Sequence, residues 1–386
     1  MHGAQPINLD ANASYGCLPE VIEGVREALG ALNPSSIHAG GQRARALIER
    51  ARDSVAALLG LRRKERIIFT SGATEANATA LFSPFATAKA GERGPPLWLT
   101  SALEHHSVLE PFARLSRMGF PGEILSAPAG FLTPESVAAW LSPETRIISF
   151  MYANNETGHL SPISDVARTI KRHSPECLIH VDAVQLLGKS DTRLFDDPID
   201  SASFSAHKIG GLSGVGALVI RDGMPFEPLL MGGAQEVRHR AGTENVPGIV
   251  AFGLAAEIVQ RGLSARIQKL RADRRFVEAE LRREIEHLVF NHPLEGGLPN
   301  TVNVTFPGLR ADDLVVALDL AGVLVSSGAA CASGKPEPSH VLKALGLTDE
   351  AARATIRISL RADHTEEELS RAVKAISQAV KAGRVR

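Results

Sequence analysis

Lys208 is a single lysine within a stretch of small, hydroxylated and glycine residues, 201–217, which reads SASFSAHKIGGLSGVGA. Apolar and hydroxyl-bearing residues precede this lysine, and the glycines that follow it let backbone pack close to a flat group. A Schiff base with a phosphorylated aldehyde, pyridoxal phosphate, needs one partly desolvated amine among hydroxyl and amide groups. Lys208 alone does not decide the matter, because most lysines in proteins are solvated.

Polar clusters follow several predicted strands directly. The strands are expected at 66–70, 97–100, 146–151, 178–182, 200–204 and 216–220, with helices between them. Near-continuous apolar strands separated by helices predict a mostly parallel sheet covered on both faces. Ligands on such sheets bind beyond the carboxyl ends of the strands, which is where these clusters lie.

The segment 71–75, Ser-Gly-Ala-Thr-Glu, joins a predicted strand to a predicted helix. A glycine turn before a helix N-terminus directs free amides and the positive end of the helix dipole at an anion. The alternative is an ordinary capped helix start, in which Thr74 only satisfies backbone amides.

The rest of the chain predicts a second, smaller unit. A long helical stretch is expected at 246–286, then an alternating, half-exposed strand at 301–306 and further strands at 323–327 and 354–360. The expected fold class is therefore α/β, with a large domain at 16–259 and a small α+β domain formed by 1–15 and 260–386.

Composition limits the classes of function. The 386 residues carry a formal net charge of -1, which gives no reason to expect direct nucleic-acid binding or a membrane surface. No apolar run reaches the length of about 18 residues that a membrane span needs. The first residues, MHGAQPINLD, lack a secretory pattern, so we expect a cytoplasmic protein. Cys17, Cys177 and Cys331 form no close pair, which argues against a disulfide framework and a Cys-x-x-Cys metal site.

Taken together, these motifs resemble those of the pyridoxal-phosphate-dependent cysteine desulfurases of the NifS/IscS type, within the class V aminotransferases. The motifs that carry the resemblance occur in order along nearly the whole chain: NPSSIHAGG (33–41), SGATEAN (71–77), EHHSVL (104–109), ANNETG (153–158), HVDAVQLLG (180–188), SFSAHKIGGLSGVGAL (203–218), RAGTENV (240–246), SSGAACASG (326–334) and IRISL (356–360). The resemblance implies an aspartate aminotransferase-like structure (fold type I) and a homodimer with active sites at the interface.

The resemblance also implies roles around the cofactor. Lys208 would hold pyridoxal phosphate covalently and act in catalysis, and Asp182 would pair with the pyridine nitrogen. His105 would stack on the ring and help move protons. Asn155 and Gln185 would reach the ring oxygen. Each has a plain alternative: Asp182 as a cap of the next helix, His105 as a core histidine, and the two amides as turn-stabilising groups.

Further roles concern the phosphate and the substrate. The residues implied at the phosphate are Ala73, Thr74, Ser205 and His207, with Thr243 contributed by the partner subunit. Arg357 would clamp the substrate carboxylate in bidentate fashion, unless it lies on the exposed face of a strand. Asn155 and Asn12 are expected at the substrate as well.

Cys331 is the residue that distinguishes between the reactions that such a site could catalyse. It lies in a loop bounded by Gly328 and Gly334, where a thiol would be exposed and mobile, as a sulfur acceptor must be. The resemblance implies that L-cysteine becomes L-alanine, that Cys331 receives the sulfur as a persulfide, and that an acceptor protein collects it for iron–sulfur clusters, thio-cofactors or tRNA thiolation. A selenocysteine lyase, a C–S lyase that needs no Cys331, and a non-catalytic assembly scaffold remain the alternatives.

The chain departs from the family pattern near its start. The usual Leu-Asp-Asn-Asn-Ala-Thr-Thr is here Leu-Asp-Ala-Asn-Ala-Ser-Tyr at 9–15. In the family this segment lies near the substrate entrance, and Tyr15 is bulkier than the threonine it replaces. Substrate preference and rate are the properties that this departure puts in doubt.

Overall fold

The main sheet has seven strands. The computed structural model describes residues 6–61, 67–86, 96–190, 193–327 and 337–385. The strand order is β2-β8-β7-β6-β5-β3-β4. Pairing is parallel from β7 across to β4, while β8 runs antiparallel to both β7 and β2. The strands are β2 (Ile67–Thr70), β3 (Leu97–Ser101), β4 (Gly122–Leu125), β5 (Thr145–Met151), β6 (Leu178–Asp182), β7 (Ser201–Ser205) and β8 (Gly216–Ile220). The predicted mostly parallel sheet is confirmed.

Helices cover both faces of this sheet, because its strands are apolar on both sides. In β2, Ile67 and Phe69 pack in one core with α3 and α8, whereas Ile68 packs with α4 on the opposite face. The helices of this unit are α1 (Pro19–Gly24), α2 (Arg26–Leu29), α3 (Ala39–Leu58), α4 (Ala73–Ala86), α5 (His106–Arg117), α6 (Pro134–Ala138), α7 (Ile163–His173) and α8 (Val246–Arg261), with single 3-10 turns η2 (Leu194–Asp196), η3 (Ala206–Lys208) and η4 (Gln235–Arg238).

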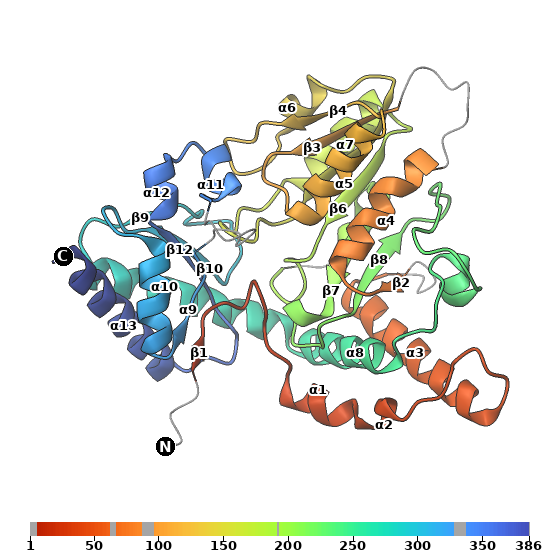
Figure 1. Ribbon diagram of the computed structural model, residues 1–386, viewed down its shortest axis with the longest axis horizontal. Helices are drawn as coiled ribbons and strands as arrows, with labels where there is room; N and C mark the ends of the chain where they lie inside the picture. The colour runs from red at the N-terminus through yellow and green to blue at the C-terminus, as the bar shows by residue number, and fades with distance from the viewer. Residues whose placement is uncertain (1–5, 62–66, 87–95, 191–192, 328–336, 386) are drawn as a thin grey trace.

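A second core lies beside the first and is built around a three-stranded antiparallel sheet, β12-β10-β9. Figure 1 shows α9 reaching from α8 to this group, where α10 and α13 cover its sheet. Its elements are β1 (Ile7–Asn8), α9 (Leu263–Glu284), β9 (Val289–Phe290), β10 (Thr301–Thr305), α10 (Ala311–Leu320), β11 (Val323–Leu324), α11 (His340–Ala344), α12 (Asp349–Arg353), β12 (Thr355–Ser359) and α13 (Glu366–Arg384). The N-terminal strand β1 pairs with β11, so this core uses both ends of the chain. The domain limits at 15/16 and 259/260 stay a prediction.

The helical stretch predicted at 246–286 is present as two helices, α8 and α9, which meet at Gly262 with axes that differ by 77°. One expectation about this second part was wrong, because strand β10 is buried along its whole length rather than half-exposed. Its polar face is covered by the larger unit and by the N-terminal segment: Asn303 Nδ2 donates to the Glu156 carbonyl at 3.2 Å, and Thr301 Oγ1 accepts from Asn12 Nδ2 at 2.8 Å. Polar and apolar side chains therefore do alternate along β10, but both faces of this strand are covered.

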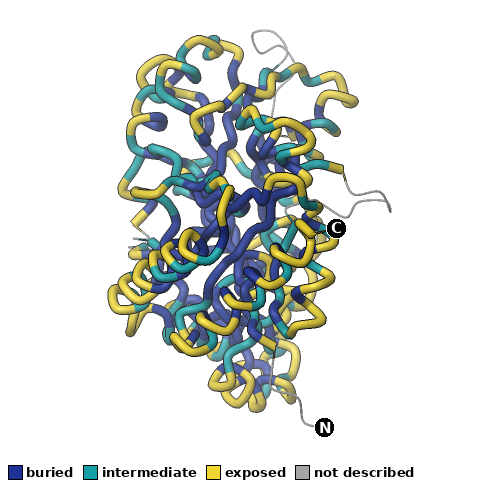
Figure 2. The backbone as a smooth tube through the Cα atoms, turned by 90° about the vertical axis from the view of Figure 1, so that its left-hand side faces the viewer, coloured by how far each residue is buried: buried dark blue, intermediate teal, exposed yellow. Residues whose placement is uncertain are grey.

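Buried backbone runs through the middle of the molecule, with exposed segments outside it (Figure 2). Within the described residues, no single helix is both long and apolar enough to cross a membrane. Tyr15 belongs to the buried set and is 2% exposed. Its ring lies between the guanidinium groups of Arg266 and Arg361, at 4.7 and 4.9 Å, and its hydroxyl accepts from the Ala362 amide. The ring of Tyr15 is thus packed inside the protein, and Tyr15 is not among the residues that line the cavity described next.

Candidate active site

A cavity of about 530 Å³ opens beyond the carboxyl ends of β5, β6 and β7, between the two cores. It brings together predicted residues that are up to 345 positions apart in the chain. The predicted residues in its wall are Asn12, Ala73, Thr74, His105, Asn155, Asp182, Gln185, Ser205, His207, Lys208 and Arg357. Thr243 is exposed and is not among the lining residues, and Cys331 lies outside the described residues.

Lys208 enters the cavity from η3, directly after β7. Its Nζ donates to the backbone carbonyls of Asn12 at 2.7 Å and Ala13 at 2.9 Å. Burial, and secondly the positive charge of Arg357, lower the pKa of this amine to about 8. Near neutral pH the neutral, nucleophilic form of this amine is therefore far more populated than in a solvated lysine.

Asp182 ends strand β6 and is held from two sides. Asn77 Nδ2 donates to its Oδ2 at 2.9 Å, and the Val184 amide donates to its Oδ1 at 3.1 Å. Asn77 is oriented by His180, whose Nε2 lies 2.9 Å from Asn77 Oδ1. Burial lowers the pKa of His180 to about 3, so this imidazole is neutral. Sequence reasoning did not single out Asn77, although it lies within the SGATEAN motif, one helical turn after Ala73.

His105 caps α5 and faces the same cavity. Its Nδ1 accepts from the Ser107 amide at 3.1 Å, which places the proton of the neutral ring on Nε2. The preceding residue, Glu104, is fully buried; it accepts from Ser101 Oγ at 2.6 Å and from the Met151 amide at 3.0 Å. Burial raises the pKa of Glu104 to about 8. This carboxyl group ties the loop that carries His105 to the end of β5.

One end of the cavity is suited to an anion. The residues 71–74 lead into α4, a 14-residue helix whose first amides have no intrahelical partner. Strand β8 approaches this turn closely, because a Cβ at Gly216 would lie 2.7 Å from the Gly72 carbonyl carbon. Ser205 and His207 line the same cavity. Burial, together with the Lys208 and Lys189 amines, lowers the pKa of His207 to about 4.

Arg357 is buried, at 5% exposure, which excludes the alternative of an exposed strand position. Its Nη1 donates to the Asn155 carbonyl at 3.1 Å, and its Nη2 pairs with Asp10 Oδ1 at 2.6 Å. Its Nε is buried without a hydrogen-bond partner among the described residues. A buried guanidinium with an unused donor in a cavity wall is suited to a carboxylate ligand. Asp10, which orients it, was not identified from the sequence.

Thr243 follows a strained turn. Glu236, Val237 and Arg238 all have positive φ, at 45°, 54° and 67°, which is rare for residues other than glycine and least favourable for a β-branched valine. The turn is anchored by Glu236, whose carboxylate receives two hydrogen bonds from Arg52, at 2.9 and 2.8 Å, and one from the Phe69 amide. The segment that carries Thr243 thus starts from a fixed point at β2.

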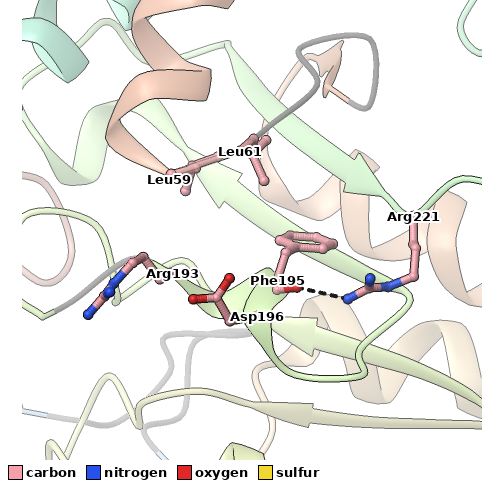
Figure 3. A pocket seen from close by; sticks show the side chains of 7 residues that line it. Leu59, Leu61, Arg193, Phe195, Asp196 and Arg221 are labelled. Carbon is pink, nitrogen blue, oxygen red and sulfur yellow. Dashed lines mark hydrogen bonds between the residues drawn. The ribbon is translucent and has the colours of Figure 1, made fainter.

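A second cavity, of about 290 Å³, lies near the end of α3 (Figure 3). It contains none of the predicted site residues. Its Arg221 guanidinium donates to the backbone carbonyls of Phe195, Asp197 and Ile199 at 2.7–3.0 Å, which gives this side chain a structural role.

The first cavity fits pyridoxal phosphate by the chemistry of its wall. It holds an amine with a lowered pKa, a carboxylate supplied with two donors, and a helix N-terminus next to a hydroxyl and a neutral imidazole. These groups match, in turn, the aldehyde, the pyridine nitrogen and the phosphate of that cofactor.

Comparisons with known proteins agree with this geometry. The Aminotransferase class-V family matches residues 7–372. The cysteine desulfurase IscS of Dictyoglomus turgidum is 39% identical over 372 residues, which cover 94% of this chain and 92% of that protein. A cysteine desulfurase of Bradyrhizobium diazoefficiens is 39% identical over 380 residues, covering 97% and 94%.

Solved structures give the same result. A NifS-like protein has a TM-score of 0.89 and 36% identity, with 98% of this chain and 100% of that chain covered. The structure of SspA in complex with cysteine has a TM-score of 0.79 and 31% identity, covering 93% and 100%.

Proposed function

The chain belongs to the Aminotransferase class-V family, and from that premise we propose that it is a cysteine desulfurase, which takes the sulfur of L-cysteine and leaves L-alanine. Relatives named as cysteine desulfurases are similar to it over nearly their whole length. The observation that carries the proposal is the single cavity shared by the Lys208 amine, the Asp182 carboxylate and the Arg357 guanidinium.

Lys208, Asp182 and the first turn of α4 are the groups that would hold the cofactor. When bound, pyridoxal phosphate supplies an aldehyde that joins to amines and a ring that withdraws electrons from the substrate Cα. Lys208 would bind it covalently, and Asp182 would face its pyridine nitrogen. Ser205, His207 and the amides at the start of α4 would bind its phosphate.

The substrate is oriented by its carboxylate. Arg357 has an unused Nε donor, and its own position is set by Asp10 and by the Asn155 carbonyl. When the substrate carboxylate is bound to Arg357, the Lys208 amine takes the proton from the substrate Cα. The amine does this in its neutral form. His105 carries its proton on Nε2 and can donate a hydrogen bond from that atom within the same cavity.

Sulfur transfer requires a second thiol, and we assign this role to Cys331. Its Sγ bonds to the substrate Sγ while the substrate Cβ–Sγ bond breaks. The electron pair of that bond stays on Cβ, which takes up a proton and becomes the methyl group of alanine. The sulfur is thereby oxidised to a persulfide and Cβ is reduced. Cys177 does not suit this role, because burial raises the pKa of its thiol to about 12.

The active unit is proposed to be a homodimer that passes its persulfide sulfur to an acceptor protein. Support for the dimer comes from the segment before Thr243, where Leu229, Leu230, Met231 and Val237 are all exposed. Apolar residues gathered on one exposed segment are typical of an interface. A second copy over this segment would bring Thr243 to a neighbouring site.

Product analysis of Cys331→Ser tests the function. The variant should keep the visible band of the bound cofactor and lose alanine formation from L-cysteine, whereas Cys17→Ser should keep both. Alanine formed at the normal rate by Cys331→Ser would refute the role given to this thiol. Pyruvate and free sulfide as products would indicate a C–S lyase, and faster turnover of selenocysteine than cysteine would indicate a selenocysteine lyase.

A further inference from the structure

Lys189 is a buried lysine to which the proposed function gives no role. It follows β6 by seven positions and is 2% exposed. Its Nζ donates to Asn12 Oδ1 at 2.9 Å and to Gln185 Oε1. Among the described residues, its hydrogen-bond partners are therefore two amide side chains and no carboxylate. A buried lysine without an acidic partner is rare, because burial strongly disfavours an unpaired charge.

The two amides are oriented by this lysine. Both turn their oxygens to Lys189, so both turn their nitrogens away from it. Gln185 Nε2 donates to the Asn12 carbonyl at 3.0 Å, and Asn12 Nδ2 donates to Thr301 Oγ1 at 2.8 Å and to the Asn155 carbonyl at 3.0 Å. An amide nitrogen carries two hydrogens. Gln185 uses one on Asn12 and keeps one for the cavity that it lines.

We propose that Lys189 is a positioning residue of the active site: its buried amine holds the side-chain oxygens of Asn12 and Gln185 and thereby presents an N–H of Gln185, rather than its oxygen, to the bound cofactor. The inference rests on the proposed function, because it assumes pyridoxal phosphate in the cavity. It adds a group that touches neither cofactor nor substrate and acts through a neighbour that does.

The surroundings of Lys189 disfavour the charged form of its amine. Three positive groups face it, those of Lys208, Arg266 and Arg357, and Arg266 Nε donates to the carbonyl of the adjacent Gly188 at 3.0 Å. Burial first, and these charges next, lower the pKa of Lys189 well below its ordinary value. The two amide oxygens accept hydrogens from this amine, so the site gains a directional pair of hydrogen bonds.

Asn12 also connects this hydrogen-bond network to Lys208. The Asn12 carbonyl accepts both from Gln185 Nε2 and from Lys208 Nζ. Asn300 Nδ2 supports Asn12 Oδ1 from the smaller unit at 3.0 Å. Loss of the Lys189 amine therefore leaves Asn12 with other partners, whereas Gln185 Oε1 loses the donor that orients it. The effect of a substitution should reach the cofactor mainly through Gln185.

A double-mutant cycle tests this route in the full-length protein. Lys189→Met and Gln185→Leu are compared singly and together, by the position of the visible absorption band and by the Kd for pyridoxal phosphate added to the cofactor-free chain. Lys189→Met should weaken binding by about two- to tenfold, the value of one hydrogen bond, and shift the band in the same direction as Gln185→Leu. The double variant should match Gln185→Leu alone.

Two further variants separate positioning from loss of stability. Lys189→Gln keeps an N–H donor group on a shorter side chain and should restore part of the band position and of the affinity, and it also serves if Lys189→Met does not fold. Ile376→Val, in the buried face of α13, should lower Tm without moving the band. Additive effects of Lys189→Met and Gln185→Leu, or an unmoved band in both Lys189 variants, would overturn this inference and leave the proposed function intact. A wild-type chain that binds no pyridoxal phosphate would overturn the proposed function and this inference with it.

Discussion

The Lys208 amine should become reactive near pH 8 rather than near pH 10. Burial and the Arg357 charge lower its pKa from 10.5 to about 8. At pH 7 a pKa of 8 leaves about 9% of the amine neutral, against about 0.03% for an ordinary lysine, which is about 300-fold more nucleophile. The environment of this one side chain therefore accounts for a large part of its ability to capture an aldehyde.

The assay is the rate at which cofactor-free protein captures pyridoxal phosphate, followed by visible absorbance from pH 6 to 10, with N-acetyl-lysine as the reference for titration of the cofactor itself. The protein's rate should rise about tenfold per pH unit below pH 8 and then level off, whereas the rate of N-acetyl-lysine should keep rising to about pH 10. Arg357→Met removes a positive neighbour and should move the midpoint upward, whereas Arg310→Met, whose side chain is 66% exposed, should not. A rate that still rises tenfold per unit between pH 9 and 10 would refute the reasoning.

Three further predictions follow from named contacts. Arg357→Lys should raise the KM for L-cysteine by about tenfold or more and leave the cofactor band in place, because lysine cannot reproduce the guanidinium fork; an unchanged KM would contradict this. Arg52→Met should lower the free energy of unfolding in urea by about 3–5 kcal/mol, because Glu236 loses its buried partner; a loss below about 1 kcal/mol would argue against it. The stability of the cofactor-free protein should rise from pH 8 to 10.5, where the unfolded chain binds more protons at Lys208; a flat profile would count against the lowered pKa.

Much of the site was predictable because its residues directly follow strands. Asp182 ends β6 and Lys208 comes three residues after β7, so the order of apolar runs already placed them at one edge of the sheet. The turn before α4, which is suited to an anion, was predictable for the same reason, since a strand, a glycine and a helix start are local features. These inferences needed only periodicity and short spacings.

Other features depend on contacts between distant parts of the chain. In the sequence, Arg357 takes a strand position that an exposed residue could also take. The partner that accompanies its burial, Asp10, lies 347 positions away. Strand β10 reads as half-exposed because the segment that covers its polar face, around Glu156, comes almost 150 residues earlier. Lys189 looks like a solvated lysine in the sequence, because one of its two amide partners, Asn12, lies 177 positions away in the N-terminal segment.

The central claim is that one amine and one thiol of this chain act on L-cysteine at a single cofactor. The most direct test is to mix full-length protein, loaded with pyridoxal phosphate, with one equivalent of L-cysteine and to analyse both products by mass spectrometry. We expect one alanine per active site and one extra sulfur atom on the peptide that contains Cys331. Pyruvate and free sulfide, with the Cys331 peptide unmodified, would contradict it.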